Sequence, residues 1–356
     1  MINQIESKND IQIDQLFSYD DKEYRNNTSF LGLCKIRVKT FILFPMRLIF
    51  KNIAFFSDYS KIIVITSPFF LPALVCYKLK DKEIITLYND LYPRALVLRG
   101  MIKNNGFIEG LLKKMNLFTY KKSNVSIFIN ELHYKFTVDE YNFSSDYLVI
   151  NVPSHLDYNP DNIRFEVVQN EVNIIYSGSL GLLHSPDTFL NFLKSNGVIP
   201  KSVKFNFQTS GAKKRYFESS VRKFASNHIR NNTIKLGGLI NDFEWEELMF
   251  NSQIGVVFQS ENAEDVIFPS KVASMLISGQ AILAFTSKSS FLGKMISKSD
   301  LGWVVESDDF LAMDNFFEEI KKPSILTVKR HNALNFGIQN FSLTKVSEKW
   351  YNAMIR

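Results

Sequence analysis

Short apolar runs alternate with helical stretches along most of the chain, and this alternation limits the folds that the chain can adopt. In the first half, strands are predicted at residues 61–66, 83–88, 125–129 and 147–152. In the second half, strands are predicted at residues 172–176, 203–208, 233–236, 254–258, 281–285 and 303–305. Helices between successive strands are typical of a parallel sheet that is covered on both faces. The sequence therefore predicts an α/β fold.

Local sequence marks several helix boundaries. Ser185 followed by Pro186 is typical of a helix start, with a capping serine and a proline in the first turn. Asn241 has Glu244 three residues later, which is the spacing of a capping box. One long helix is predicted over residues 93–115.

The length of the chain and one cluster of turn-forming residues predict two domains. A chain of 356 residues is too long for one hydrophobic core. Residues 151–160 follow a strand and are rich in Pro, Asn, Asp and Ser, so they are predicted to form the hinge. We expect an N-terminal domain at 1–155, a second domain at 156–335, and helices at 336–356 that pack back on the first domain.

Composition excludes several classes of protein. Hydrophobic residues make up 46% of the chain and charged residues 22%, which indicates a globular protein. Cys34 and Cys76 are the two cysteines, the N-terminus is polar, and a reducing cytoplasmic location is expected. The histidines show no metal-binding spacing, and the glycine-rich nicotinamide and ATP motifs are absent from the sequence. We expect no metal and no cofactor.

One segment between two predicted strands has the features of an anion site. Pro269 can open a helix there, and Gly279 can close it with a left-handed cap. Ser270 and Lys271 would lie in the first turn, where free N–H groups and the helix dipole attract phosphate. The alternative is a buried helix with one surface lysine.

Small and basic residues also follow the other strands of the second domain. In a doubly wound domain, ligands bind beyond the carboxyl ends of the strands. The residues predicted at these ends are Gly178, Ser179, Gly211, Lys214, Gly237, Gly238 and Gln259. Together they predict a site for a nucleotide diphosphate.

The pattern Gln-x5-Asp-x3-Pro-Ser-Lys-x3-Met-Leu-x-Ser-Gly from Gln259 to Gly279 resembles the donor-site segment of glycosyltransferase family four. The similarity is to the bacterial branch that builds surface polysaccharides, including colanic-acid and O-antigen fucosyl-type transferases. Residues 176–181, 335–350 and the Asp-x-Tyr-Pro element at 90–93 resemble further parts of that family. The resemblance covers roughly residues 60–356.

The resemblance implies a GT-B fold, with two doubly wound, Rossmann-like domains that face a cleft. It implies transfer of a hexose from a nucleotide-diphosphate sugar to a lipid-linked saccharide during O-antigen, capsule or exopolysaccharide synthesis. The reaction would retain the anomeric configuration without a metal. Residues 1–30 contain no glycine, so the first strand unit of the N-terminal domain is either missing or diverged.

The resemblance also implies roles for individual residues. Lys271 would stabilise the leaving diphosphate, with Lys214 as the second choice. Asp265 and Glu264 would face the donor sugar. Many relatives carry Glu-x7-Glu, and Ser274 occupies the position of the glutamate that holds the ribose.

Asp90 follows a predicted strand in the first domain. It either orients the acceptor or caps the turn that follows, since aspartate is common in turns. Both interpretations are open.

The net charge of +6 has a distribution that favours lipid over nucleic acid. Residues 35–56 interleave five cations with bulky apolar side chains, which suits a segment at the surface of an anionic membrane. Its uncharged stretch is far shorter than the ~20 residues that cross a bilayer. We expect a peripheral protein on the inner face of the cytoplasmic membrane and no nucleic-acid partner. The alternatives are a core helix at 35–56 and, for the whole chain, a catalytically silent GT-B partner protein.

Overall fold

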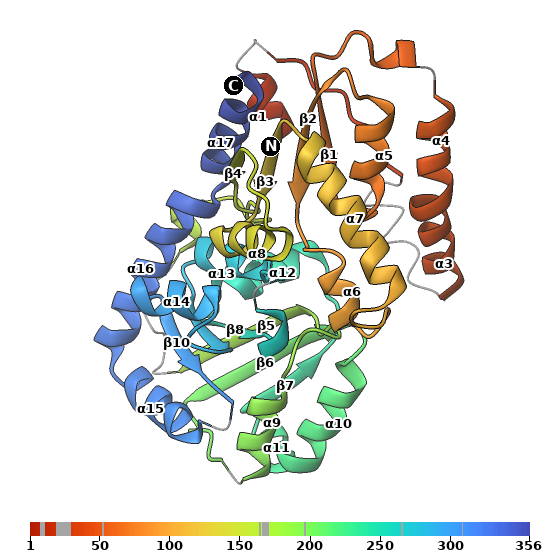
Figure 1. Cartoon of the computed structure of the whole chain (residues 1–356). Helices are drawn as coiled ribbons and strands as arrows, with labels where there is room; N and C mark the ends of the chain where they lie inside the picture. Colours follow the sequence, from red (N-terminus) through yellow and green to blue (C-terminus); the bar gives the residue numbers. More distant parts are fainter. Residues whose placement is uncertain are drawn as a thin grey trace. The chain divides into compact units, whose positions relative to one another are not determined.

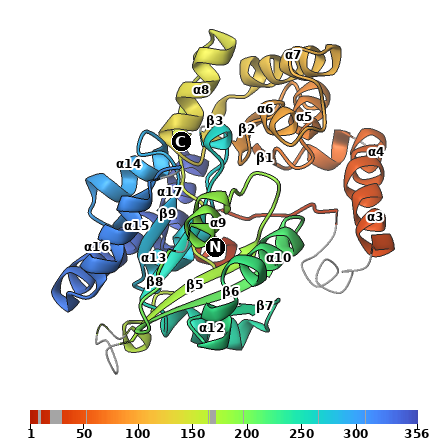
Figure 2. The ribbon, with the colours of Figure 1, turned by 90° about the horizontal axis from the view of Figure 1, so that it is seen from below.

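The computed structural model describes residues 1–7, 11–18, 30–51, 53–163, 165, 171–195, 197–264, 266–307 and 309–356. The chain forms two compact units (Figures 1 and 2). Unit 1 comprises Met1–Ile150 and Ser347–Arg356, and unit 2 comprises Asn151–Val346. The sequence predicted boundaries after residues 155 and 335.

Unit 1 contains a four-stranded parallel sheet in the order β1-β2-β3-β4. The strands are β1 (Lys61–Ile65), β2 (Glu83–Tyr88), β3 (Val125–Phe128) and β4 (Tyr147–Val149). The helices are α1 (Ile2–Glu6), α3 (Phe30–Val38), the π-helical η1 (Lys39–Leu43), α4 (Phe44–Phe50), the 3-10 turn η2 (Ile53–Phe56), α5 (Leu71–Lys78), α6 (Arg94–Leu98), α7 (Phe107–Lys122), α8 (Glu131–Tyr141) and the C-terminal part of α17 (Leu343–Ile355).

The core of unit 1 lies between this sheet and the helices that cover it. Tyr88 of β2 stacks on Tyr120 of α7 and on Phe128 of β3, with ring centroids 4.5 and 5.2 Å apart. Helix α5 packs on β1 and α7, and α4 packs on α5. The C-terminal helix is tied to the start of the chain, because Ser347 Oγ donates to Gln4 Oε1 at 3.0 Å.

Unit 2 contains a six-stranded parallel sheet in the order β10-β9-β8-β5-β6-β7. The strands are β5 (Val172–Ser179), β6 (Val203–Ser210), β7 (Ile234–Gly237), β8 (Ile254–Phe258), β9 (Ala281–Phe285) and β10 (Gly302–Val305). The helices are η3 (Pro160–Asn162), α9 (Asp187–Lys194), α10 (Lys214–Phe224), α11 (Ser226–Arg230), α12 (Asp242–Phe250), η5 (Glu261–Ala263), α13 (Lys271–Ile277), α14 (Phe291–Lys298), α15 (Phe310–Ile320), α16 (Pro323–Phe341) and the first turn of α17.

The strand order of unit 2 creates a switch point between β5 and β8. The chain moves outward from β5 to β7, returns to the centre at β8 and moves out again to β10. Loops after β5 and β8 therefore diverge, and ligands of doubly wound sheets bind where such loops part.

Both faces of the central strands β8 and β9 are buried. Alternate strand residues, such as Tyr176, Phe207 and Phe258, join side chains of α9, α10 and α15 in one core cluster. Helices α13 and α16 pack together and contact β9. The alternation with a period of two residues and the buried runs confirm the α/β fold class.

Two helix predictions need correction. The helix predicted over residues 93–115 is two helices, α6 and α7, because Gly100 adopts φ +68° and Gly106 forms the cap of α7. Pro186, not Ser185, occupies the cap position of α9, and the Ser185 hydroxyl instead donates to Asp187 Oδ2 at 2.5 Å. The Asn241 cap is confirmed, since its Oδ1 accepts from Glu244 N at 2.9 Å.

Candidate functional site

The amino group of Lys271 lies at the carboxyl end of β5. Lys271 is the first residue of α13, and its Nζ is 3.8 Å from the centroid of the Tyr176 ring. A β-carbon placed on Gly178 would lie 3.5 Å from the same Nζ, and Gly178 adopts φ +123°. A side chain at position 178 would therefore be strained and would contact the amine.

Burial controls the charge of this amine. Nζ is buried and has no hydrogen-bond partner among the residues that the structure describes. Burial lowers the pKa of Lys271 to about 7. The Tyr176 ring attracts a cation but accepts no ordinary hydrogen bond, so the amine still lacks an oxygen acceptor among the described residues. An anion that reached Nζ would supply the acceptor and favour the charged form.

A second group of predicted residues gathers at the end of β6. Gly211 adopts φ +89°, and a β-carbon there would lie 2.3 Å from Ser179 Oγ. Lys214 Nζ is 3.7 Å from Glu218 Oε1 and 3.3 Å from the position of a β-carbon on Gly238. A recess of about 530 Å³ opens beside Gly211, Lys214 and Glu218. The structure thus brings Ser179, Gly211 and Lys214 together at neighbouring strand ends.

Lys213 and Lys214, at the start of α10, make different contacts. Lys213 Nζ donates to the carbonyl oxygen of His184 at 2.8 Å, and the ring of His184 accepts from Gly181 N at 3.0 Å. Lys213 therefore holds the loop after β5, while Lys214 borders the recess.

Gln259 and Glu264 hold the loop after β8. Gln259 Nε2 donates to Ile267 O at 2.8 Å, and its Oε1 lies 3.0 Å from Thr286 Oγ1. Glu264 Oε1 accepts from Thr286 Oγ1 at 2.9 Å and from Ser287 N at 2.7 Å. A polar recess of about 240 Å³ lies beside Gln259 and Thr286. Contact of Gln259 or Glu264 with the donor stays a prediction.

The remaining predicted residues have varied surroundings. Asp265 lies outside the described residues. Ser270 caps α13 through its backbone position and is exposed. Ser274 is buried, and its Oγ accepts from His155 N at 3.3 Å, so it faces the chain at residues 154–155. The ribose role of Ser274 stays a prediction.

Asp90 belongs to unit 1 and is engaged in an ion pair. Its Oδ2 is 3.1 Å from Arg99 Nη2, and both side chains are partly buried. The carboxylate thus ties the loop after β2 to the end of α6. Its contact with an acceptor stays a prediction.

Comparison with known proteins identifies the architecture. No protein-family model and no curated protein matches this sequence. Anabaena HepE was solved with UDP and also with UDP-glucose. Its UDP complex superposes on this chain with a TM-score of 0.66 and a sequence identity of 10%. The superposition covers 89% of this chain and 83% of HepE.

Two further solved structures are similar to this chain over most of its length. A Rickettsia africae glycosyltransferase superposes with a TM-score of 0.63 at 16% identity, over 99% of this chain and 87% of the other. Sucrose-phosphate synthase from Thermosynechococcus elongatus gives 0.61 at 12% identity, over 92% and 79% of the two chains.

The fold is GT-B. The predicted fold class, with two Rossmann-like domains, is confirmed. The narrower assignment to family four and to its fucosyl-type branch stays a prediction.

One buried residue that supports the candidate site carries no recognisable signal in the sequence. Arg330 of α16 is fully buried, and its Nε donates to the carbonyl oxygen of Gly279 at 2.8 Å. Burial lowers the pKa of Arg330 to about 10. This contact fixes the C-terminal end of α13, whose first residue is Lys271. The two partners are 51 positions apart, so no local pattern indicates the contact.

Proposed function

We propose that the protein is a glycosyltransferase that moves a hexose from a nucleotide-diphosphate sugar to a lipid-linked saccharide. The observation that carries the proposal is the buried amine of Lys271, which has no hydrogen-bond partner in the described part of the chain and lies at the switch point of the sheet. A diphosphate would supply the missing oxygens. The GT-B fold supports this proposal, because the similar protein HepE was solved with UDP-glucose.

The reaction needs the diphosphate to be stabilised as it leaves. The bond from the anomeric carbon to the phosphate oxygen breaks, the acceptor oxygen bonds to that carbon, and the hydroxyl proton is released. Negative charge grows on the leaving oxygen, where Lys271 as an ammonium group would bind it. A preorganised contact of this kind typically contributes ~3 kcal/mol to the transition state. We propose a retaining reaction without a metal.

Among the described residues, no group of three or more His, Cys, Asp and Glu side chains is arranged to hold a metal ion. Lys271 and Lys214 would supply positive charge at the proposed phosphate site. Gly178 and Gly211 leave their backbones open to the phosphate, because neither carries a side chain.

We propose that the acceptor belongs to bacterial surface polysaccharide synthesis and that the protein works at the inner face of the cytoplasmic membrane. The exposed apolar and basic side chains of residues 31–51 support this assignment. No described helix is long and apolar enough to span a bilayer.

Titration calorimetry with UDP and with GDP, each with a chelator present, tests the proposal. We expect one of the two nucleotides to bind at one site per chain, and Lys271→Ala to weaken that binding. If neither nucleotide binds, while single-stranded nucleic acid binds with a steep dependence on salt, the transferase assignment is wrong. If the nucleotide binds but no membrane extract accepts a sugar, the silent partner protein becomes the better interpretation.

A further inference from the structure

The helices at the margin of unit 1 are apolar on two opposite sides. We call residues 30–50, which comprise α3, η1 and α4, the basic helical segment; Figures 1 and 2 show it as one rod beside α5. Phe44 and Leu48 of α4 pack against the core cluster formed with β1 and α5. Ile42, Met46 and Phe50 lie on the side of the segment away from this cluster, and their side chains are 51%, 45% and 79% exposed. A helix that is apolar all round is normally buried on both sides. The described part of unit 1 buries only one side of this segment.

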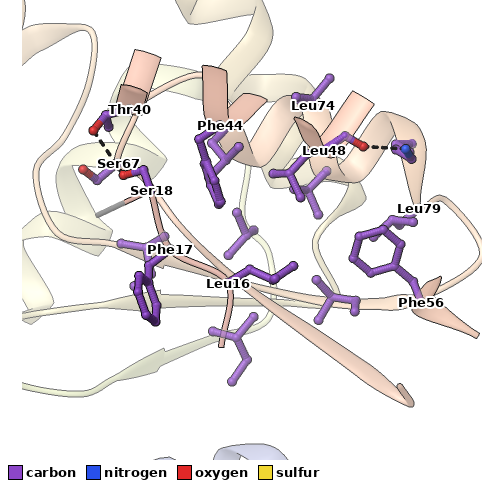
Figure 3. A pocket seen from close by; sticks show the side chains of 17 residues that line it. Leu16, Phe17, Ser18, Thr40, Phe44, Leu48, Phe56, Ser67, Leu74 and Leu79 are labelled. Carbon is purple, nitrogen blue, oxygen red and sulfur yellow. Dashed lines mark hydrogen bonds between the residues drawn. The ribbon is translucent and has the colours of Figure 1, made fainter. Parts of the chain in front are cut away.

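An apolar pocket lies between this segment and the sheet (Figure 3). Its volume is about 390 Å³, which is within the range of ligand sites. Aliphatic and aromatic side chains form most of the wall, including Leu16, Phe44, Leu48, Phe56, Leu74 and Leu79. All the residues that line the pocket belong to unit 1.

Three of the polar side chains that line the pocket, those of Ser18, Thr40 and Lys78, are already bonded within the protein. Ser18 Oγ and Thr40 Oγ1 are 3.1 Å apart, and Figure 3 shows this pair on one side of the pocket. On the other side, Lys78 Nζ donates to the carbonyl oxygen of Ile49 at 2.7 Å and also bonds those of Leu48 and Lys51. These bonds satisfy the end of α4 and leave the middle of the wall apolar. Such a wall suits a ligand without polar atoms.

The pocket is open to the surface past exposed apolar side chains. Ile63 and Ile65 of the edge strand β1 line it and are 36% and 42% exposed. Phe17 lines it as well and is 61% exposed. A ligand that entered there would cover apolar area that now faces water, which is favourable.

The charged side chains of the basic helical segment are all cations. Residues 30–57 contain no aspartate or glutamate, while Lys35, Arg37 and Arg47 are exposed cations. Lys51 Nζ lies 3.3 Å from the centroid of the Phe55 ring, beside the end of α4. Cations next to exposed apolar side chains complement a surface of anionic headgroups and hydrocarbon.

We propose that the apolar pocket takes one hydrocarbon chain of a membrane lipid while the outer side of the basic helical segment lies on an anionic bilayer. This inference deepens the membrane part of the proposed function and rests on it. Unit 1 would hold one acyl chain as an anchor, and the cations would bind the headgroups around it.

Photocrosslinking tests the position of the chain. The full protein is bound to vesicles of phosphatidylcholine and phosphatidylglycerol, in which a trace of phosphatidylglycerol carries a diazirine in the middle of one acyl chain. Irradiation and mass spectrometry of peptides then locate the adducts. We expect adducts on Phe44, Leu48 and Leu74, inside the pocket. Adducts confined to Ile42 and Phe50 would mean surface docking alone and would overturn the proposal.

A pocket-filling variant adds a control. Leu74→Trp should lower the pocket adducts at least tenfold, whereas Leu111→Trp, at a position 49% exposed on α7, should leave them unchanged. Circular dichroism checks that both variants fold, and Leu48→Trp replaces Leu74→Trp if the latter does not. Equal adduct yields in all folded variants would contradict the proposal.

Two further measurements separate this inference from the rest. The affinity for UDP or GDP should be the same in Leu74→Trp and in the unaltered protein. Failure of the transferase assignment would therefore be recognised independently of the lipid pocket. Light scattering should show a protein that does not form a dimer through the basic helical segment. A stable dimer, with the segment protected from hydrogen exchange on dimerisation, would assign this surface to a second copy and overturn the proposal.

Discussion

Lys271 in unit 2 and the basic helical segment in unit 1 place opposite kinds of side chain in unfavourable surroundings. Lys271 carries a polar group into the interior, where Nζ has no hydrogen-bond partner among the described residues. The segment instead holds apolar side chains in water, with Leu31 and Phe50 each 79% exposed. In the first region an anion would relieve the unfavourable burial, and in the second a hydrocarbon phase would relieve the exposure.

The proposed nucleotide site and the proposed membrane surface are built in different ways. The proposed nucleotide site is built from strand ends that the fold fixes, so its specificity would depend on a few positions such as Gly178 and Lys271. The proposed membrane surface is spread over several helical turns and many side chains. We therefore expect single substitutions to act strongly in unit 2, while grouped substitutions are needed in unit 1.

The largest expected effect is in unit 1. Replacing Arg37, Lys39, Arg47 and Lys51 by glutamine should lower binding to phosphatidylglycerol vesicles roughly 1000-fold, because each cation near an anionic surface contributes about 1 kcal/mol. Vesicle flotation at low salt measures the change.

The matched control removes four cations from elsewhere in the same unit. Lys103, Lys114, Lys121 and Lys122 are exposed and lie outside the segment. Their replacement by glutamine should change flotation little. Equal losses in both sets would show that total charge, and not the segment, attracts the protein to lipid.

The next effect is in unit 2. Lys271→Ala should lower turnover about 100-fold with the fold intact, since ~3 kcal/mol of transition-state stabilisation is lost. The loss should appear more in kcat than in donor binding. Lys271→Arg should recover part of it, because a planar guanidinium has a different reach. Transfer of labelled sugar to membrane extracts measures turnover.

Lys288→Ala is the control for loss of charge alone. Lys288 is 57% exposed and pairs with Glu306 at 3.5 Å. Near-normal turnover in both alanine variants would mean that Lys271 does not act on phosphate, and Lys214 would become the candidate.

Removing the same amine should stabilise the free protein. Lys271→Met should raise the free energy of unfolding by about 2 kcal/mol, the order expected for a buried polar group without a partner. The pKa of Lys271 is 10.5 unfolded and about 7 folded, so between these values the unfolded chain binds more protons. The stability of the unaltered protein should therefore rise with pH across this window.

The gap between the two proteins should accordingly be largest below pH 7 and should narrow toward pH 10.5. Urea unfolding at about pH 6 and about pH 9 measures it. A gap that stays constant with pH would show that Lys271 has a partner in the folded protein.

The last effects, no larger than that of Lys271→Met, concern two glycines. Gly211→Ala should destabilise unit 2 by ~2 kcal/mol, because φ is +89° and a β-carbon would meet Ser179 Oγ at 2.3 Å. Gly110→Ala on α7 should stabilise unit 1 by up to ~1 kcal/mol, since no described atom lies within 4 Å of its β-carbon. Thermal unfolding measures both. Equal changes in the unfolding temperature of the two variants would contradict the backbone geometry at Gly211.

Sequence patterns located the strands well because each strand carries either a continuous apolar run, as in β8 and β9, or alternating apolar residues, as in β6. The predicted strands at 83–88, 254–258 and 281–285 match β2, β8 and β9 at both ends. The helix predicted over residues 93–115 was wrong, because the effect of Gly100 and Gly106 on the backbone outweighed the apolar pattern. Element type was thus easier to predict than element boundaries.

The candidate site was only partly visible in the sequence. Motif and strand-end positions pointed to Gly178, Gly211 and Lys271, which carry this information locally. The Arg330 contact with Gly279 and the Lys213 contact with His184 were missed, because they join residues that are distant along the chain. The sequence also gave no sign that Ser274 Oγ would face His155 N.

The sequence by itself determined the fold class and the kinds of side chain that follow each strand, because apolar periodicity and turn residues act over a few positions. Only the tertiary structure decided which strands are neighbours, and so placed the end of β5 beside that of β8. Tertiary packing also removed Lys271 Nζ from water and left Ile42, Met46 and Phe50 in it. Burial depends on what the rest of the chain packs against a residue, and no local pattern contains that information.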